Sequence, residues 1–398
     1  MTRISFPADF YWGAATAAHQ IEGGNTTSDW WYKEHLQPPR VETPSGDACD
    51  SYHRYREDMK LLADAGLTMY RFSIEWARVE PAPGEYSFAQ RAHYGRMIEA
   101  AREYGLEPMV TLHHFTLPQW LERAGGWLAP GAIDRFEAYV AFCLPILDNV
   151  TWICTINEPN MMAIMARMDA DRAAGNVDLR AAGLPEPSVP VARVLRAAHE
   201  RVVDLLHSRS SSRQKQVGWS VATQAFQALP GAEEATRSYG YPRDAWFIEQ
   251  AARDDWIGIQ AYTRTQVGVD GPLPVPESAE KTLTGWEYYP HALAEGIQLS
   301  ATYAPGVPIF VTENGIATDD DNRRIDYVME ALRGLAQARR AGIVILGYLY
   351  WSLLDNYEWG SYRPTFGLVG VDRQTFERIP RPSLEWLGSI AQTGGFDA

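Results

Sequence analysis

The sequence predicts an α/β fold: a single (β/α)8 barrel (TIM barrel) spanning residues 1–398 as one domain, with its functional site at the carboxyl ends of the strands. Eight short apolar stretches have the composition of buried strands, and helical patterns lie between most of them. This alternation is typical of a parallel α/β protein, and the number eight favours a closed barrel over an open sheet. No linker-like or low-complexity stretch divides the chain.

The expected elements follow one another along the whole chain. The strands are expected at 10–16, 67–73, 107–113, 150–157, 216–222, 255–262, 307–313 and 343–351. The clearest helical patterns lie at 53–65, 88–104, 131–146, 190–208, 243–253 and 322–341. No G-x-G-x-x-G sequence follows the first strand, which argues against an open sheet that binds dinucleotides.

Composition limits the classes of partner. A hydrophobic content of 46% and a charged content of 22% are those of a soluble globular protein. The formal net charge is −14, so we expect neither nucleic acid nor an anionic membrane as a partner. The oligomeric state leaves no signal in the sequence. No stretch approaches the roughly 18 consecutive apolar residues of a membrane-spanning helix.

Cysteine use points to a reducing compartment. Cys49, Cys143 and Cys154 are odd in number and widely separated, so they indicate neither a disulfide framework nor a zinc site. Residues 1–9 lack the apolar core of a signal peptide. We therefore expect a cytoplasmic protein without a metal or cofactor.

Two of the expected strands run directly into a glutamate. Residues 308–315 (PIFVTENG) end in Glu313, and residues 150–159 (VTWICTINEP) end in Glu158. A carboxylate is costly to bury at a strand end unless it is paired or used. Parallel strands deliver both glutamates to the same end of a barrel, which is the arrangement that carboxylate-pair glycosidases require.

Other polar and aromatic residues stand at the same strand ends. In strand order they are His19, Gln20, Glu22, Arg71, Glu75, His113, His114, Asn157, Gln260, Tyr262, Asn314, Trp351, Asp355, Glu358 and Trp359. Amides, imidazoles, carboxylates and indoles around one opening suit a neutral polyhydroxylated ligand, because hydroxyls need donors and acceptors and sugar C–H faces need an aromatic plane.

Two rival chemistries have less support. Adjacent residues on a strand point to opposite faces, so only one of His113 and His114 can face the barrel interior, which argues against a metal site there. A Ser-His-Asp hydrolase would carry a G-x-S-x-G turn, and the sequence has none.

The chain resembles glycoside hydrolase family 1, the retaining β-glucosidase and β-galactosidase family. The segments that carry the resemblance are 10–23 (FYWGAATAAHQIEG), 70–76 (YRFSIEW), 155–159 (TINEP), 312–315 (TENG) and 351–359 (WSLLDNYEW). They occur in the family's order and at similar spacing, and they span nearly the whole chain.

The resemblance implies catalytic roles. Glu158 would be the general acid/base and Glu313 the nucleophile, with carboxyl groups about 5 Å apart in a retaining mechanism. Arg71 and Tyr262 would contact Glu313 and keep it ionised, because a cation and a hydrogen-bond donor both favour the carboxylate.

It also implies a set of sugar contacts. The residues matching the family's donors and acceptors to the sugar are Gln20, His114, Asn157, Glu358 and Trp359. Asn157 is expected to bind the 2-hydroxyl, Trp351 to form a stacking floor, and Trp286 to lie on the aglycone side. Phe366 is expected near the 6-position of the sugar.

The implied activity is hydrolysis of unphosphorylated β-D-glucosides through a covalent glycosyl-enzyme, with transfer to alcohols. Glu358 would repel a 6-phosphate, which argues against a 6-phospho-β-glucosidase, the first alternative. The second alternative, a non-catalytic sugar-binding relative, would lack one or both glutamates. The sequence leaves the preference for glucosides over galactosides or fucosides open.

Some positions depart from the family pattern. Phe115 stands where many members carry tryptophan, and Gln260-Ala261 replaces the usual Asn-Tyr. The segment 359–367 is one residue shorter than usual, which bears on where Phe366 lies. The chain is also shorter between Glu158 and Gln260, so we expect a more open entrance that admits bulky aglycones.

Overall fold

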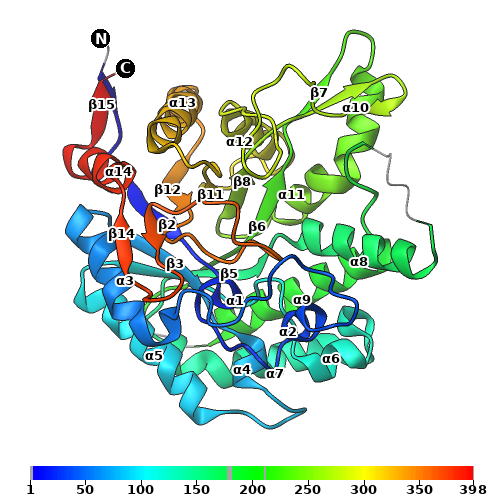
Figure 1. Ribbon diagram of the computed structural model, residues 1–398, viewed down its shortest axis with the longest axis vertical. Coiled ribbons are helices and arrows are strands. Elements are labelled where there is room, and N and C mark those ends of the chain that lie inside the picture. Colours follow the sequence, from blue (N-terminus) through cyan, green and yellow to red (C-terminus); the bar gives the residue numbers. More distant parts are fainter. Residues whose placement is uncertain (1–2, 177–181, 210–211, 398) are drawn as a thin grey trace.

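Eight parallel strands close into a barrel at the centre of the computed structural model, which describes residues 3–176, 182–209 and 212–397 (Figure 1). In order around the barrel they are β2 (Tyr11–Ala15), β3 (Met69–Ser73), β4 (Glu107–Thr111), β5 (Trp152–Asn157), β6 (Gln216–Thr223), β8 (Ile257–Ala261), β11 (Ile309–Asn314) and β12 (Ile345–Trp351). β12 pairs with β2 and closes the ring. Each strand overlaps its expected stretch, so the predicted closed α/β barrel is confirmed.

The strand sequences explain why they lie inside the molecule. β5 and β11 are buried along their whole length. Their apolar and β-branched residues suit a strand that packs on two faces, inward on the barrel interior and outward on the helices. Because the strands are parallel, their carboxyl ends meet at one end of the barrel.

Helices surround the barrel (Figure 1). The long ones are α3 (Ser51–Ala65), α5 (Phe88–Glu103), α7 (Ala132–Leu147), α8 (Pro159–Ala173), α9 (Val189–Ser208), α12 (Ala292–Tyr303), α13 (Asp321–Arg340) and α14 (Pro382–Thr393). The shorter ones are α1 (Ala18–Ile21), α2 (Asp29–Glu34), α4 (Trp76–Val79), α6 (Gln119–Arg123), the 3-10 turn Gly126–Leu128, α10 (Glu233–Gly240) and α11 (Trp246–Gln250).

One expected helix, 243–253, differs from the structure. It begins as a π-turn at Tyr241–Ala245, continues as α11 and ends at Gln250. The Asn160 amide donates to the Arg243 carbonyl at 2.8 Å, and the Asp244 carboxylate accepts from the Ala245 amide at 2.6 Å. Such side-chain bonds compete with the regular helical ladder and explain the widened turn.

Within the part of the chain that the structure describes, seven short strands lie outside the barrel. β1 (Arg3–Ser5) pairs antiparallel with β15 (Gly395–Asp397), which brings the two ends of the chain together (Figure 1). β7 (Phe226–Ala228), β9 (Thr265–Gly268) and β10 (Gly271–Pro272) form a small sheet beyond the ends of β6 and β8. β13 (Val369–Val371) pairs with β14 (Arg378–Pro380).

Aromatic rings fill the barrel interior near the amino ends of the strands. The Phe310 ring lies 5.0 Å from Trp152, 5.7 Å from Trp256 and 5.9 Å from Tyr11 between centroids. Gly347 on β12 leaves room for this packing, because a Cβ there would lie 2.5 Å from a carbon of the Phe310 ring. The amino end of the barrel is therefore solid, and space for a ligand is left at the carboxyl end.

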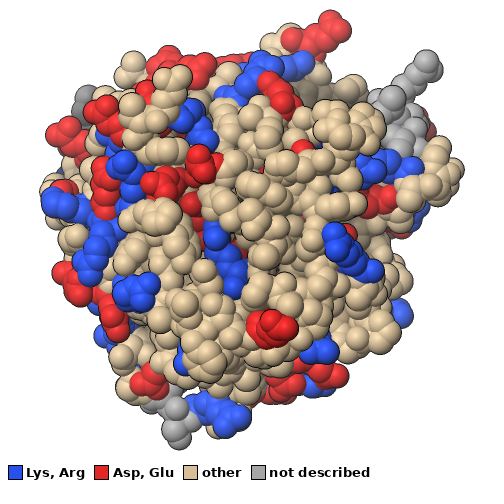
Figure 2. All heavy atoms as spheres, turned by 60° about the horizontal axis from the view of Figure 1, so that its bottom comes forward, with Lys and Arg blue, Asp and Glu red and all other residues tan. Residues whose placement is uncertain are grey.

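Charge is mixed on the face drawn in Figure 2. There, acidic and basic side chains are interspersed around a broad uncharged area, and the residues drawn in colour form no continuous basic surface. Within the described residues, no helix is both long enough and apolar enough to cross a membrane.

We expect Phe310→Ala to lower the free energy of unfolding by about 3–5 kcal/mol, because the cavity would open among rings that cannot collapse together. Urea unfolding followed by tryptophan fluorescence measures this loss. The matched control is Phe88→Ala, because Phe88 is 68% exposed and its removal should cost less than about 1 kcal/mol. Equal losses in the two variants would contradict the assignment of Phe310 to the barrel core.

Candidate active site

A cavity of about 360 Å³ opens at the carboxyl ends of the barrel strands. Its lining residues come from the ends of three strands and from the loops and helices that follow the barrel strands: Gln20, Trp30, His114, Phe115, Glu158, Met161, Met165, Ala222, Gln224, Tyr262, Trp286, Glu313, Trp351, Glu358, Trp359 and Phe366. Both strand-end glutamates face this one space. Arg71 and Asn157 lie fully buried behind it.

Glu313, near the end of β11, is held by two donors. Arg71 Nη1 donates to its Oε1 at 2.6 Å, and the Tyr262 hydroxyl donates to its Oε2 at 2.6 Å. Arg71 itself has no exposed surface. Burial raises the pKa of Tyr262 well above its ordinary value, so the phenol keeps its proton and can donate.

Glu158 follows β5 and sits where the chain turns into α8. Its backbone is in the left-handed region (φ 46°, ψ 57°), and its amide donates to the Ser220 carbonyl at 2.7 Å. Pro159 occupies the first helical position, where a missing N–H costs nothing. A non-glycine residue at positive φ is uncommon, and such strain is concentrated at functional sites.

The surroundings of the two glutamates give their carboxyl groups different pKa values. Burial raises the pKa of Glu158 well above its usual range, and the nearby negative charge of Glu313 raises it further. Burial also raises the pKa of Glu313, but there the Arg71 charge and the Tyr262 hydrogen bond act in the opposite direction. The proton of the pair therefore resides on Glu158, and Glu313 is the carboxylate.

Asn157 and His114 continue the network that starts at Arg71. Asn157 Oδ1 accepts from Arg71 Nη2 at 2.5 Å and from Gln260 Nε2 at 2.8 Å, which fixes the orientation of its amide. Its Nδ2 then lies 3.2 Å from His114 Nε2 and donates to it. Burial lowers the pKa of His114 well below its usual value, so the ring is neutral and its proton is on Nδ1.

Glu358, Gln20 and Trp351 form a second polar group across the cavity. Trp351 Nε1 donates to Glu358 Oε1 at 3.2 Å, and Gln20 Nε2 lies 3.4 Å from Oε2. Burial raises the pKa of Glu358 to about 8. Within the described residues, Gln20 Oε1 and His114 Nδ1 are buried without a protein partner, so each is free to bind a ligand hydroxyl.

Aromatic rings line the rest of the cavity. Trp359 lies nearly parallel to His114 (13°) at 6.3 Å, and His114 lies nearly parallel to Trp351 (15°) at 6.0 Å. Trp286 is 40% exposed at the rim and lies 5.7 Å from Tyr262. Phe366 is buried 5.9 Å from the Tyr262 ring, so the shortened segment before it still brings it to the cavity.

Some polar residues at the strand ends face away from the cavity. His19 bonds to Glu34, Glu22 pairs with Arg78, and Glu75 accepts from Thr116.

His113 packs edge-on against Trp127 at 5.2 Å, whereas His114 faces the cavity. As expected, only one of the two adjacent histidines points toward the site. Among the described residues, no group of three or more His, Cys, Asp or Glu could hold a metal ion.

Six lining residues were not among the predicted site residues: Trp30, Phe115, Met161, Met165, Ala222 and Gln224. Met161 and Met165 are one helical turn apart on α8, directly after Glu158. Their spacing of four after a strand-end carboxylate is the signal that could have identified them, because residues four apart share one face of a helix.

Comparisons with known proteins relate nearly the whole chain to one family. The family model described as glycosyl hydrolase family 1 matches residues 2–251 and 259–396. The chain is 32% identical to thermostable beta-glucosidase B of Thermobispora bispora, over 98% of this chain and 92% of the relative. It is 31% identical to a bifunctional beta-D-glucosidase/beta-D-fucosidase of Bifidobacterium breve, over 97% and 98%. The crystal structure of beta-glycosidase BGL167 is 41% identical and superposes with a TM-score of 0.88 over 99% of both chains.

The raised pKa of Glu358 predicts a pH-dependent effect of Glu358→Gln on stability. A carboxyl group that holds its proton up to about pH 8 in the folded state, against 4.5 as its ordinary value, makes the folded state less stable as pH rises between these values. The neutral amide lacks this loss. The melting temperature of the variant minus that of the wild type should therefore be more positive at pH 8 than at pH 5. A difference that does not change with pH would contradict the raised pKa.

Proposed function

The chain belongs to glycosyl hydrolase family 1, and from that premise we propose that it is a retaining, exo-acting β-glucosidase with Glu313 as nucleophile and Glu158 as acid/base. The observation that carries this proposal is the unequal environment of the two glutamates. One is held as a carboxylate by Arg71 and Tyr262, and the other is kept protonated by burial and by its neighbour's charge. A retaining mechanism needs this division of roles.

The first step would use both groups at once. Glu158 donates its proton to the glycosidic oxygen while a Glu313 oxygen attacks the anomeric carbon. The C–O bond to the aglycone breaks, the aglycone leaves as an alcohol, and the sugar becomes an ester of Glu313. Asn157, fixed by Arg71 and Gln260, is placed to bind the 2-hydroxyl, where hydrogen bonds strengthen in the transition state.

The second step would reverse these roles. Esterification removes the charge of Glu313, so the pKa of Glu158 falls and its carboxylate can take a proton from water. The resulting hydroxide equivalent attacks the anomeric carbon, releases the sugar with retained configuration and restores Glu313. An alcohol in place of water would give transglycosylation by the same route.

The polar groups of the cavity support an unphosphorylated sugar. Gln20 Oε1 and His114 Nδ1 each offer one free hydrogen-bonding position, and Glu358 offers acceptors. Because Glu358 keeps its proton up to about pH 8, repulsion alone does not exclude a sugar phosphate near neutral pH. The 6-phospho alternative has less support because the described lining of the cavity carries no Lys or Arg side chain to bind a phosphate. The bifunctional relative from Bifidobacterium breve supports extending the proposal to β-fucosides, and β-galactosides remain a candidate. The buried floor behind the cavity favours exo action, because only the end of a saccharide can enter.

The outer wall of the cavity supports an apolar aglycone. Met161 and Met165 follow Glu158 on α8, so they lie on the side from which the leaving group is protonated. Phe115 and Trp286 complete the wall, and Gln224 adds an amide. A second sugar would find few partners for its hydroxyls there, whereas an aromatic or alkyl group would be desolvated by thioethers and rings.

We also propose that residues 1–398 form one catalytic domain in a reducing, cytoplasmic setting. The barrel draws its strands from Tyr11 to Trp351, which supports a single domain. Cys49, Cys143 and Cys154 are free thiols buried in the fold, which supports a compartment that keeps them reduced.

The roles of the glutamates predict different substrate dependence for two isosteric variants. Glu313→Gln should lower kcat/KM by at least about 10⁴-fold for every aryl β-glucoside, because no ester can form. Glu158→Gln should lower kcat/KM by about 10²–10⁴-fold for substrates with poor leaving groups. It should retain most of kcat/KM on 2,4-dinitrophenyl β-glucoside, because that phenolate leaves without a proton. The reverse pattern would show that the two roles are exchanged, and an inactive wild type would remove the proposal.

The apolar wall predicts a preference that depends on the methionines. Wild type should have a higher kcat/KM for an octyl or phenyl β-glucoside than for cellobiose. Met165→Gln should lower this ratio by about tenfold, because it replaces a thioether by a group that binds hydroxyls. Met168→Gln is the matched control, since Met168 is on the same helix and 40% exposed but does not line the cavity. An unchanged ratio in Met165→Gln would contradict this role.

A further inference from the structure

Three of the residues that line the cavity lie on one loop without regular structure. Residues 355–368 form neither helix nor strand, yet they carry Glu358, Trp359 and Phe366. Backbone hydrogen bonds of a helix or sheet do not fix these side chains. We call residues 355–367 the pocket loop, and its two ends are tied together by side chains from elsewhere in the chain.

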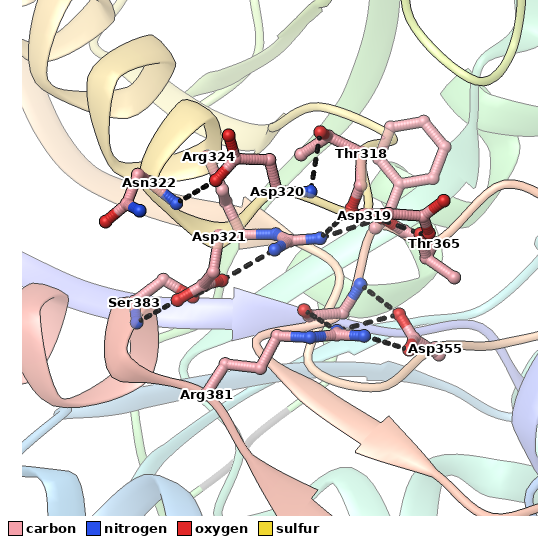
Figure 3. A network of polar contacts seen from close by, with 12 residues as sticks. Thr318, Asp319, Asp320, Asp321, Asn322, Arg324, Asp355, Thr365, Arg381 and Ser383 are labelled. Atoms are coloured by element: carbon pink, nitrogen blue, oxygen red, sulfur yellow. Dashed lines mark hydrogen bonds and ion pairs between the residues drawn. The ribbon is translucent and has the colours of Figure 1, made fainter.

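The first tie joins the two ends of the pocket loop directly. The Gly367 amide donates to Asp355 Oδ1 at 2.8 Å. Arg381 donates to both oxygens of Asp355, at 3.0 and 2.5 Å, and to the Gly367 carbonyl at 2.5 Å. The backbones at the two ends nearly touch, because a Cβ on Gly367 would lie 2.3 Å from the Asp355 nitrogen. Arg381 thus bridges the beginning and the end of the loop (Figure 3).

The second tie holds the residues just before Gly367. Arg324, fully buried on α13, donates to the Thr365 carbonyl at 2.9 Å and to the Tyr350 hydroxyl at 3.1 Å. The Tyr350 hydroxyl in turn donates to the Phe366 carbonyl at 2.9 Å. Figure 3 shows Arg324 and Arg381 approaching the segment from two separate elements.

Three consecutive carbonyls, those of residues 365, 366 and 367, are therefore each bound by a different side chain. The charges of both arginines are balanced locally, Arg324 by Asp321 at 2.6 Å and Arg381 by Asp355. Charge-assisted hydrogen bonds of this kind are stronger than neutral ones and have a fixed geometry. These hydrogen bonds constrain the backbone at Phe366 more tightly than contacts with water constrain the backbone of an exposed loop.

The constrained residue touches the catalytic group. The Phe366 ring packs edge-on against Tyr262, at 5.9 Å and 74°, and lies 6.3 Å from Trp286. The Tyr262 hydroxyl donates to the carboxylate of Glu313. A displacement of the loop end would therefore move the ring that supports the donor to the proposed nucleophile.

We propose that Arg381, through Asp355 and Gly367, is a positioning residue that closes the pocket loop and sets Phe366 against Tyr262. Arg324 and Tyr350 assist from the other side. This inference rests on the proposed function of the site, which it deepens. Arg381 does not line the cavity and acts only through the loop.

A double-mutant cycle of Arg381→Met and Phe366→Ala tests this proposal. The readouts are kcat/KM on an aryl β-glucoside and the dissociation constant of a glucose-configured iminosugar, each referred to folded protein. Arg381→Met alone should lower kcat/KM by about tenfold, because a displaced Phe366 ring would let the Tyr262 donor move away from its position on Glu313. The loss in the double variant should be at least about threefold smaller than the product of the single losses, since both changes act on one contact. Arg381→Lys, which keeps the charge, should recover part of the rate.

Arg378→Met is the matched control. Arg378 lies three residues away in a buried pair with Asp58, at 2.7 and 3.1 Å, and it contacts no pocket residue in the described structure. It should lower the melting temperature at least as much as Arg381→Met but leave kcat/KM of the folded protein unchanged, and its effect should multiply with that of Phe366→Ala.

The outcomes separate the two claims. If the wild type is active and the losses of kcat/KM caused by Arg381→Met and Phe366→Ala multiply in the double variant, the positioning role is overturned and the glucosidase proposal stands. A wild type that binds the iminosugar without turnover would count against the glucosidase, and the cycle of dissociation constants would still support or overturn the role of Arg381. A wild type that neither turns over nor binds would overturn both.

Discussion

The buried ion pair between Arg71 and Glu313 is the interaction on which the rest of the pocket depends. The same guanidinium also donates to Asn157, whose amide donates to His114, so one cation on β3 orients polar side chains from β11, from β5 and from the segment after β4. Removing one partner of a buried charge pair is strongly destabilising. These side chains are therefore held in a single arrangement. The closed barrel makes that arrangement rigid, because it fixes the backbone positions from which the side chains extend.

The same pair would also favour completion of the proposed reaction. An ester on Glu313 would leave the Arg71 guanidinium buried beside a group without charge, with neutral acceptors on Thr111, Asn157, Thr312 and Cys154. Regenerating the carboxylate restores the pair. A contact that stabilises the free protein would thus raise the energy of the intermediate relative to both ends of the cycle, which helps the glycosyl group to leave.

Features that depend on residues close together in the sequence could be predicted, whereas features that depend on contacts between distant residues could not. The eight strands and the position of Glu158 and Glu313 at their ends were predictable, because a buried apolar run followed by a carboxylate is a local signal. Met161 and Met165 were missed because their spacing is also that of ordinary core residues. The bridge from Arg381 to Asp355 and Gly367 was beyond prediction, since residues 26 positions apart meet only through the fold. The turn at Tyr241–Ala245 differed from a regular helix for the same reason, a bond from the distant Asn160.

The two methionines in the outer wall of the cavity, Met161 and Met165, also make the cavity sensitive to oxidation. Met161 and Met165 are half-buried and face the cavity, so an oxidant small enough to enter would meet two thioethers. Oxidation to the sulfoxide turns a flexible apolar side chain into a polar one. We expect peroxide treatment to shift the ligand preference of the outer wall from apolar groups toward hydroxylated ones while the two glutamates stay intact. Past exposure of the protein to oxidants would then change which leaving groups its cavity prefers.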